Sequence, residues 1–275
     1  MSRARTIAAA KINVALVVGP RREDGLHEVA TVLQRIDLCD RVELEAGDGL
    51  AVTGFEDTIV GSALRSLAAE AGVTPAWRVR IGKEIPVAAG LGGGSADAAA
   101  ALRLANAALP EPLSPQRLAA VAAAVGADVP FFLAPGPKLA EGAGGRLTPL
   151  DLPQDYWVVI VLPRRLEKDS TAAVYARFDE LGGGPGFQKR KAGLLDTLAR
   201  VRTPADLAAL PPNDLAEASG AAPWAEELQV AGAIRADVSG AGPAVYGLFE
   251  SRRKARSAGR RFGRHARVWT VPPVW

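Results

Sequence analysis

The residues that most clearly suggest chemistry lie in the run IPVAAGLGGGSADAAAALRLAN, which covers residues 85–106. Four glycines within five positions precede an alanine-rich segment of strong helix propensity. These glycines are Gly90, Gly92, Gly93 and Gly94. Ser95 is the expected N-cap of the helix. Because a helix N-terminus presents unpaired N–H groups and the positive end of the helix dipole, glycines there let the backbone approach a phosphate.

The same run also fits a plain glycine turn between a strand and a helix, and the pattern alone does not separate the two interpretations. It does exclude two common nucleotide-binding motifs. A P-loop requires a lysine after its last glycine, and G-x-G-x-x-G requires a glycine where Ser95 stands. Asp97, early in the helix, is explained by the helix dipole.

A second group of polar residues stands near the start of the chain. Residues 6–18 alternate as a strand does, with apolar side chains on one face. Lys11 and Asn13 share the other face. The pattern predicts either a polar site or a lysine that reaches solvent along apolar surface.

Asp128 is a further candidate, because it directly precedes the apolar segment VPFFL at residues 129–133. Taken alone, its simplest role is to cap a short helix.

These residues require a mixed scaffold to position them. Strand and helix patterns alternate along the chain without a fixed repeat, so the predicted fold class is α+β. Further strands are predicted at 30–34, 41–45 and 77–81, and a helix between Ser114-Pro115 and Gly126. The pattern restarts at Tyr156 with the strand YWVVIVL, followed by ADV, AVYGLF and RVWTV around a basic helix. Residues 182–191 are predicted to form a loop.

Composition indicates a soluble protein, because 48% of its 275 residues are hydrophobic and no apolar run is long enough to span a bilayer. We expect no membrane partner and a cytoplasmic location, which the single cysteine, Cys39, fits. The N-terminus resembles a signal peptide, but Lys11 and Asn13 interrupt its apolar stretch.

The basic run SRRKARSAGRRFGRHARVW, at residues 251–269, suggests a test for nucleic-acid binding. Its spacing favours the solvated face of a helix, since it lacks the interleaved aromatic residues of a single-strand platform. We therefore expect no nucleic-acid partner.

The glycine run PVAAGLGGGSADAAAAL resembles the phosphate-binding loop of the GHMP kinases, the superfamily of galactose, homoserine, mevalonate and phosphomevalonate kinases. Two other blocks resemble one family within it, the 4-diphosphocytidyl-2-C-methyl-D-erythritol kinases. They are AAAKINVALVVGPRREDGLHEV at residues 8–29 and GADVPFFL at residues 126–133. Weaker matches follow in STAAVYARFD, in Asn213-Asp214-Leu215 and in VSGAGPAVYGLF, so the resemblance runs from about Ala8 to Phe249.

This resemblance implies transfer of the γ-phosphoryl group of ATP to the 2-hydroxyl of the methylerythritol moiety, in the non-mevalonate route to isoprenoid precursors. Lys11 and Asp128 match the family's catalytic pair, with Asp128 as the base and Lys11 as the cation beside it. ATP and Mg²⁺ are the expected cofactors. Ser95 is a possible metal contact as well as the expected N-cap, and the other metal ligands are unknown.

The resemblance assigns ATP binding to the loop and to the start of its helix. The residues concerned are Pro86, Val87, Ala88, Ala89, Gly90, Leu91, Gly92, Gly93, Gly94, Ser95 and Ala96.

The resemblance also implies an acceptor with a cytidine diphosphate moiety. His27 matches the histidine that reads the base, Tyr175 matches a stacking ring, and Asn13 belongs to the same substrate site. Leu26 stands where the family usually has tyrosine, so we expect an apolar wall there instead of a ring. A second departure is Asp57-Thr58 in place of the usual Asp-Asn, which exchanges an amide for a hydroxyl.

The expected architecture is that of the GHMP kinases, with an N-terminal α+β ATP-binding domain at 1–150 and a C-terminal domain with a ferredoxin-like sheet at 151–275. The active site is expected in the cleft between them. A relative acting on homoserine or mevalonate would keep the glycine loop without needing GLHEV or Tyr175. A non-catalytic ligand sensor would be expected to lose Lys11 or Asp128, and this chain keeps both. The oligomeric state, monomer or homodimer, is left open.

Overall fold

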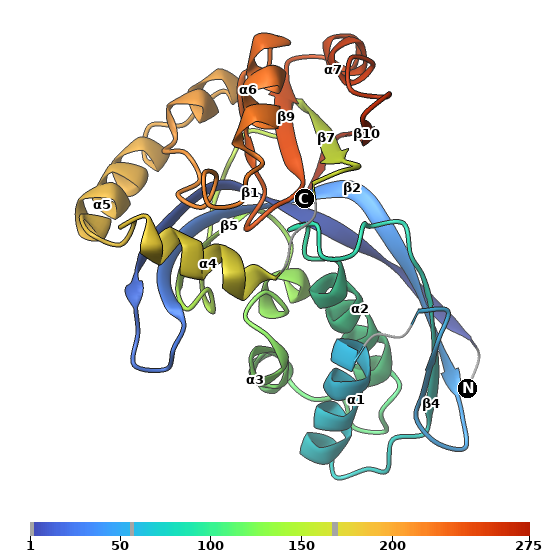
Figure 1. Cartoon of the computed structure of the whole chain (residues 1–275). Coiled ribbons are helices and arrows are strands. Elements are labelled where there is room, and N and C mark those ends of the chain that lie inside the picture. Colours follow the sequence, from blue (N-terminus) through green and yellow to red (C-terminus); the bar gives the residue numbers. More distant parts are fainter. Residues whose placement is uncertain (1–2, 56–57, 167–169) are drawn as a thin grey trace. The chain divides into compact units, whose positions relative to one another are not determined.

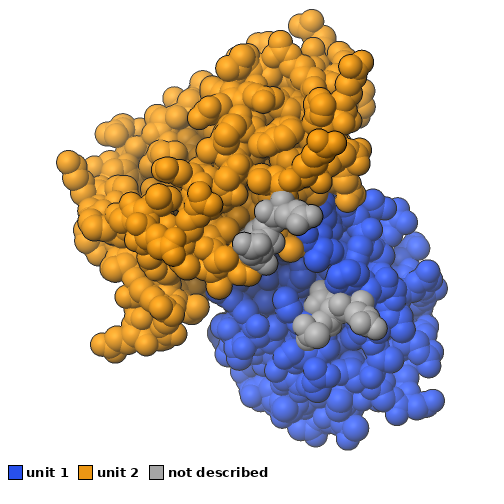
Figure 2. Space-filling model, viewed as in Figure 1, with its two compact units in different colours: residues 1–10, 38–87, 92–135 blue, residues 11–37, 88–91, 136–275 orange. Residues whose placement is uncertain are grey.

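The computed structural model describes residues 3–55, 58–166 and 170–275. Strands and helices are mixed along the chain, as the α+β pattern predicts (Figure 1). The chain divides into two compact units (Figure 2). Unit 1 comprises residues 1–10, 38–87 and 92–135, and unit 2 comprises residues 11–37, 88–91 and 136–275. The long strands β1 (Ala4–Arg21) and β2 (His27–Ala46) contribute residues to both units, and the boundary at residue 150 stays a prediction.

Unit 1 combines a small sheet with a group of helices. The second half of β2 pairs antiparallel with β4 (Trp77–Gly82), and β3 (Ala51–Thr53) lies parallel to β4. Alternate residues of β4 are buried and exposed, as its sequence pattern predicts. The helices α1 (Thr58–Ala71), α2 (Gly93–Ala107) and α3 (Pro115–Val125) pack against one another, and the 3-10 helix η1 (Pro130–Leu133) follows.

Of the two helix N-caps predicted in unit 1, one is confirmed and the other is wrong. The side chain of Ser114 caps α3 by accepting the N–H of Arg117, and Gly126 ends that helix, as predicted. For α2 the predicted cap is wrong. Its N-cap is Gly92, whose left-handed φ of 70° turns the chain into the helix, so Ser95 is the third helical residue. Glycine adopts this conformation without the steric penalty of a side chain.

Unit 2 contains two groups of strands. The first half of β2 pairs antiparallel with β5 (Lys138–Gly142), β5 pairs with β6 (Arg146–Pro149), and β11 (Pro273–Val274) also pairs with β2. Within the described residues, a separate four-stranded antiparallel sheet has the order β10-β7-β9-β8. Its strands are β7 (Trp157–Pro163), β8 (Arg235–Val238), β9 (Val245–Phe249) and β10 (Ala266–Val271). These match the four segments predicted from Tyr156 onward, whereas the strands predicted at 30–34 and 41–45 are parts of the single strand β2.

The helices of unit 2 are α4 (Thr171–Glu180), α5 (Phe187–Leu198), α6 (Ala222–Val230) and α7 (Arg252–Gly259), with the 3-10 helix η2 (Pro204–Ala209). Residues from α6 and α7 pack on the four-stranded sheet around Val159, Leu228 and Phe249. The basic side chains of α7 are exposed while Ala255 and Ala258 are buried, which is the solvated helix face that the sequence predicts.

The loop predicted at 182–191 is wrong from Phe187 onward. Gly186, with a φ of 77°, precedes α5, and the Phe187 ring is buried. The glycines of residues 182–186 suggested that the whole segment is a loop, but burial of the Phe187 ring favours a helix that begins at this residue. No helix among the described residues is long and apolar enough to cross a membrane.

Candidate functional site

Residues 88–91 of the glycine loop belong to unit 2 and are held there by hydrogen bonds. Gly90 has a φ of 84°, and a β-carbon at this position would overlap the carbonyl oxygen of Ser239. The hydroxyl of Ser239 donates to the carbonyl oxygen of Gly90 at 3.0 Å, and the N–H of Ala244 donates to that of Ala89 at 3.1 Å. The protein backbone itself therefore requires glycine at position 90.

Lys11 and Asn13 lie beside this loop segment in the same unit. Both side chains are buried, at 5% and 4% exposure. Lys11 Nζ donates to Asn13 Oδ1 at 2.6 Å, and Asn13 Nδ2 donates to Thr31 Oγ1 at 2.8 Å. The backbone N–H of Lys11 donates to the carbonyl oxygen of Leu91 at 2.9 Å. The polar strand face predicted from the sequence is thus a buried hydrogen-bonded pair, not a lysine reaching solvent.

Gly92 to Ala96, which include the start of α2, belong to unit 1, as do Pro86 and Val87. A β-carbon at Gly93 would lie 3.0 Å from Ile85 Cγ2 and 3.2 Å from Lys83 Nζ, so an added side chain here would crowd both neighbours. Asp128, also in unit 1, is half-buried just before η1. The N-cap of η1 is Val129, so Asp128 does not occupy the cap position that its alternative role requires.

A buried charge cluster in unit 1 was missed by the sequence analysis. Lys83 Nζ lies 2.5 Å from Asp40 Oδ2 and 2.8 Å from Asp97 Oδ2, and both carboxylates are 0% exposed. Asp40 Oδ1 also accepts the backbone N–H groups of Glu84 and Ile85.

Asp97 lies beyond the first turn of α2 and pairs with Lys83, so the helix dipole is not the explanation of this residue. Burial raises its pKa from 3.8 to about 7, the charge of Asp40 adds to this rise, and Lys83 opposes it. A carboxylate among the small apolar residues of this helix was the sequence signal that could have indicated a buried ion pair.

Two of the residues expected at the cytidine end, His27 and Tyr175, are in contact in unit 2. The rings of His27 and Tyr175 have centroids 4.8 Å apart at an angle of 32°, and the His27 side chain is 7% exposed. His27 Nε2 lies 2.9 Å from Asp179 Oδ1. Asp179 was missed, although it follows Tyr175 by four residues and so shares its face of α4. Leu26, at 54% exposure, precedes His27.

The second departure from the family pattern involves Asp57 and Thr58. Asp57 lies outside the described residues, and Thr58 is the first residue of α1.

Comparison with known proteins first defines a class. The family model for the GHMP kinases N terminal domain matches residues 58–136, and that for the GHMP kinases C terminal matches residues 219–267. The first match spans α1 to η1 with the start of α2, and the second spans the turn between β8 and β9. Fold and glycine loop therefore define a GHMP kinase.

Individual relatives that match most of the chain indicate one family within the GHMP kinases. The 4-diphosphocytidyl-2-C-methyl-D-erythritol kinase of Anaeromyxobacter sp. strain Fw109-5 is 39% identical over 94% of this chain and 86% of its own length. That of Geobacter metallireducens is 40% identical over 91% of both chains. A crystal structure of 4-(cytidine 5'-diphospho)-2C-methyl-D-erythritol kinase matches with a TM-score of 0.81 and 31% identity, covering 99% of this chain and 100% of that one. The chain belongs to the 4-diphosphocytidyl-2-C-methyl-D-erythritol kinase family.

Proposed function

We propose that this chain is an ATP-dependent kinase that phosphorylates the 2-hydroxyl of 4-diphosphocytidyl-2-C-methyl-D-erythritol in the non-mevalonate route to isoprenoid precursors. The observation that carries the proposal is the buried Lys11–Asn13 pair beside glycine-loop residues 88–91. Relatives of this name at 39% and 40% identity support the substrate.

The proposed chemistry needs a base, a cation and a phosphate cradle. Asp128 accepts the proton of the acceptor hydroxyl while the oxygen of that hydroxyl bonds to the γ-phosphorus. ADP departs with the electron pair of the broken P–O bond. Lys11 stabilises the negative charge on the transferring group. Asn13 orients the ammonium through its 2.6 Å contact, and Thr31 fixes the orientation of the Asn13 amide.

The glycine loop supplies the proposed phosphate site, from Pro86 to Ala96. The start of α2 offers N–H groups and the positive end of the helix dipole, and no side chain occupies the cap position at Gly92.

Mg²⁺ is the proposed metal. The described part of the chain contains no group of three or more His, Cys, Asp or Glu side chains placed to hold an ion. Mg²⁺ commonly binds substrate phosphates and water and takes few protein ligands. The hydroxyl of Ser95, in the first turn of α2, is the candidate protein contact, and the metal would neutralise phosphate charge.

The proposed acceptor site comprises His27, Tyr175, Leu26 and Asn13. His27 would read the cytosine edge by hydrogen bonding, Tyr175 would stack on the base, and Leu26 would form an apolar wall. We also propose a cytoplasmic location and no nucleic-acid partner.

A phosphorylation assay tests the function. Purified protein with ATP and Mg²⁺ is given 4-diphosphocytidyl-2-C-methyl-D-erythritol, homoserine or mevalonate, and the products are separated and counted. We expect transfer to the cytidine-containing alcohol alone. Efficient transfer to another alcohol would refute the acceptor, and transfer to none of them would refute the activity.

A further inference from the structure

The turn at residues 239–243, between β8 and β9, packs on two parts of the proposed active site in unit 2. Gly240 has a φ of 57°, and a β-carbon there would lie 3.2 Å from Asn13 Oδ1 and 3.5 Å from Lys11 Nζ. It would also lie 3.5 Å from the carbonyl oxygen of Gly90, to which the neighbouring Ser239 donates. A small displacement of this turn would therefore be felt by the lysine, the asparagine and the glycine loop together.

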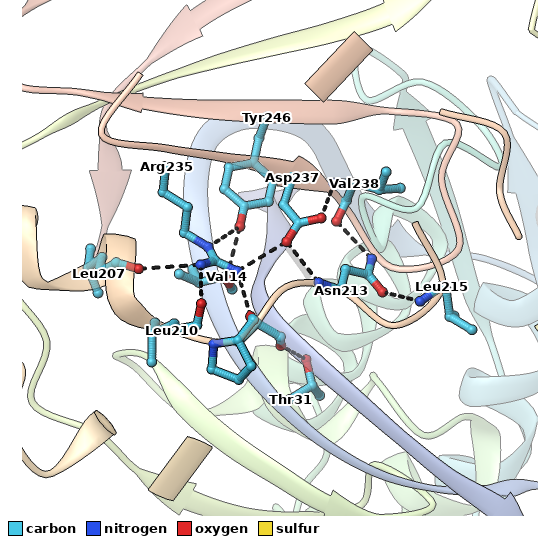
Figure 3. A network of polar contacts seen from close by, with 12 residues as sticks. Val14, Thr31, Leu207, Leu210, Asn213, Leu215, Arg235, Asp237, Val238 and Tyr246 are labelled. Carbon is cyan, nitrogen blue, oxygen red and sulfur yellow. Dashed lines mark hydrogen bonds and ion pairs between the residues drawn. The ribbon is translucent and has the colours of Figure 1, made fainter. Parts of the chain in front are cut away.

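The side chain of Asn213 fixes the turn. Asn213 is 3% exposed, and its Nδ2 donates to the carbonyl oxygen of Val238 at 2.9 Å (Figure 3). The same Nδ2 donates to the carbonyl oxygen of Gly240 at 2.7 Å. Its Oδ1 accepts the N–H of Leu215 at 2.9 Å, which orients the amide so that both donors face the turn.

A buried network in turn fixes Asn213. Its backbone N–H donates to Asp237 Oδ2 at 2.8 Å, and that oxygen lies 3.0 Å from Arg235 Nη2. Arg235 Nε donates to the Tyr246 hydroxyl, which donates to the carbonyl oxygen of Val14 at 2.9 Å. Because Val14 follows Asn13 on β1, the network joins the strand that carries Lys11 to the turn that packs on it (Figure 3).

We infer that Asn213 is a positioning residue for phosphoryl transfer, because its amide holds the Gly240 backbone beside Lys11, Asn13 and the carbonyl oxygen of Gly90. The inference rests on the proposed function of Lys11. The size of the expected effect follows from the finding that a displacement of about 1 Å at a reacting group can lower a rate by roughly 100-fold.

Asn213→Asp is the sharpest test, because it keeps the size of the side chain and the acceptor for Leu215 but replaces the donor with an oxygen facing two carbonyls. We expect kcat to fall by roughly 10- to 100-fold. Asn106→Asp is the matched control. Asn106 lies at the end of α2 that is far from the glycine loop, and its amide accepts the backbone N–H of Leu113 and donates to the carbonyl oxygen of Leu113. Its kcat should stay at the wild-type value.

A pH profile separates positioning from general damage. As the pH falls, protonation of the introduced carboxyl restores one donor toward Gly240, so the ratio of variant to wild-type kcat should rise. The charged groups around this position are Asp237, which accepts the backbone N–H of residue 213, Arg235, which contacts Asp237, the next residue Asp214 with its partner Arg190, and Lys11 beside Gly240. All of them are present in wild type and variant alike.

An unchanged kcat in folded Asn213→Asp, an equal loss in Asn106→Asp, or a ratio that does not rise at low pH would each overturn the inference. If Asn213→Asp does not fold, Asn213→Ala removes the donor without adding a carboxylate, and a wild-type kcat there would also overturn it. An inactive wild-type protein would instead refute the proposed function, so the two failures are distinguishable.

Discussion

At the scale of single residues, the imidazole of His27 has its hydrogen-bonding pattern set by a neighbour. An ionised carboxylate only accepts hydrogen bonds, so the 2.9 Å contact with Asp179 assigns the proton to Nε2. In the neutral ring, Nδ1 is then an acceptor. The N4 amino group of cytosine donates, whereas the corresponding O4 of uracil accepts, so an Nδ1 acceptor at the proposed base site would favour cytosine.

Removing the Asp179 carboxylate should therefore weaken base discrimination. We expect Asp179→Ala to lower the ratio of the UMP and CMP dissociation constants several-fold, because one hydrogen bond contributes about 0.5–1.5 kcal/mol. Calorimetric titration of both nucleotides measures the ratio. Glu180→Ala, at the next and exposed position of α4, is the control and should leave it unchanged. An unaltered ratio in Asp179→Ala would contradict the assignment.

Leu26→Tyr tests the departure from the family pattern. The exposure of Leu26 leaves room for a larger side chain, so the ring can be added without overpacking. Stacking is worth about 1–3 kcal/mol per base, so CMP should bind several-fold more tightly or better, while ATP affinity stays constant. Tyr175→Ala should weaken CMP binding in the same titration. If neither substitution changes CMP affinity, the base does not bind beside these residues.

The proposed catalytic pair makes a third residue-scale prediction. Asp128→Asn and Lys11→Ala should retain ATP binding and each lose roughly 10²–10⁴ in turnover, because one lacks the proton acceptor and the other the cation. Asp196→Asn, an exposed position of α5, is the control. Near-normal turnover in a folded Asp128→Asn protein would refute its role as the base.

At the scale of elements, local signals predicted helix ends well where a side chain does the capping. Ser114 and Gly126 bound α3 as expected, because their effects depend on neighbours in sequence. The start of α2 depends on more distant packing. Gly90 faces Ser239 and Gly93 faces Lys83 and Ile85, contacts that a glycine run does not reveal. The sequence therefore predicted the loop and its helix but not why each glycine is needed.

Gly93→Ala measures this packing directly. Alanine favours a helix over glycine by about 1 kcal/mol, but its β-carbon would press on Ile85 and Lys83. We expect a net loss of stability in thermal unfolding. Gly61→Ala in α1 is the matched control in the same unit, since its β-carbon would meet only the flexible Arg65 side chain at 3.5 Å, and it should be neutral or stabilising. A gain in stability for Gly93→Ala equal to that control would contradict the packing argument.

At the scale of the whole molecule, the sequence predicted the α+β class and the family, which the family matches confirm. It could not predict how residues distant in the chain assemble. Asp40 on β2, Lys83 after β4 and Asp97 on α2 meet only in the tertiary structure. Likewise, Asn213 was noted only as part of a weak family match, because its contacts with Gly240 and Asp237 are made across the fold.

The Asp40–Lys83–Asp97 cluster makes stability depend on pH in a direction opposite to that of an ordinary salt-bridged carboxylate. In the unfolded chain Asp97 releases its proton near pH 4, whereas in the folded chain burial and Asp40 hold its pKa at about 7. Between these values the folded state binds more protons than the unfolded state. The contribution of Asp97 is thus fully present below about pH 4 and is lost as the pH rises to about 7.

Asp97→Asn should remove this dependence, because the amide does not titrate. The free energy of unfolding of the variant minus that of wild type should therefore increase from pH 4 to pH 7, by at most about 1.4 kcal/mol per pH unit for one proton, and level off above pH 7. Denaturant titrations at half-unit pH steps give this difference, in which groups common to both proteins largely cancel. Asp48→Asn, an exposed carboxyl of the same unit, should give no such increase. A flat or falling difference for Asp97→Asn would mean that Lys83 outweighs burial and Asp40, and that Asp97 is a charged member of the cluster throughout this range.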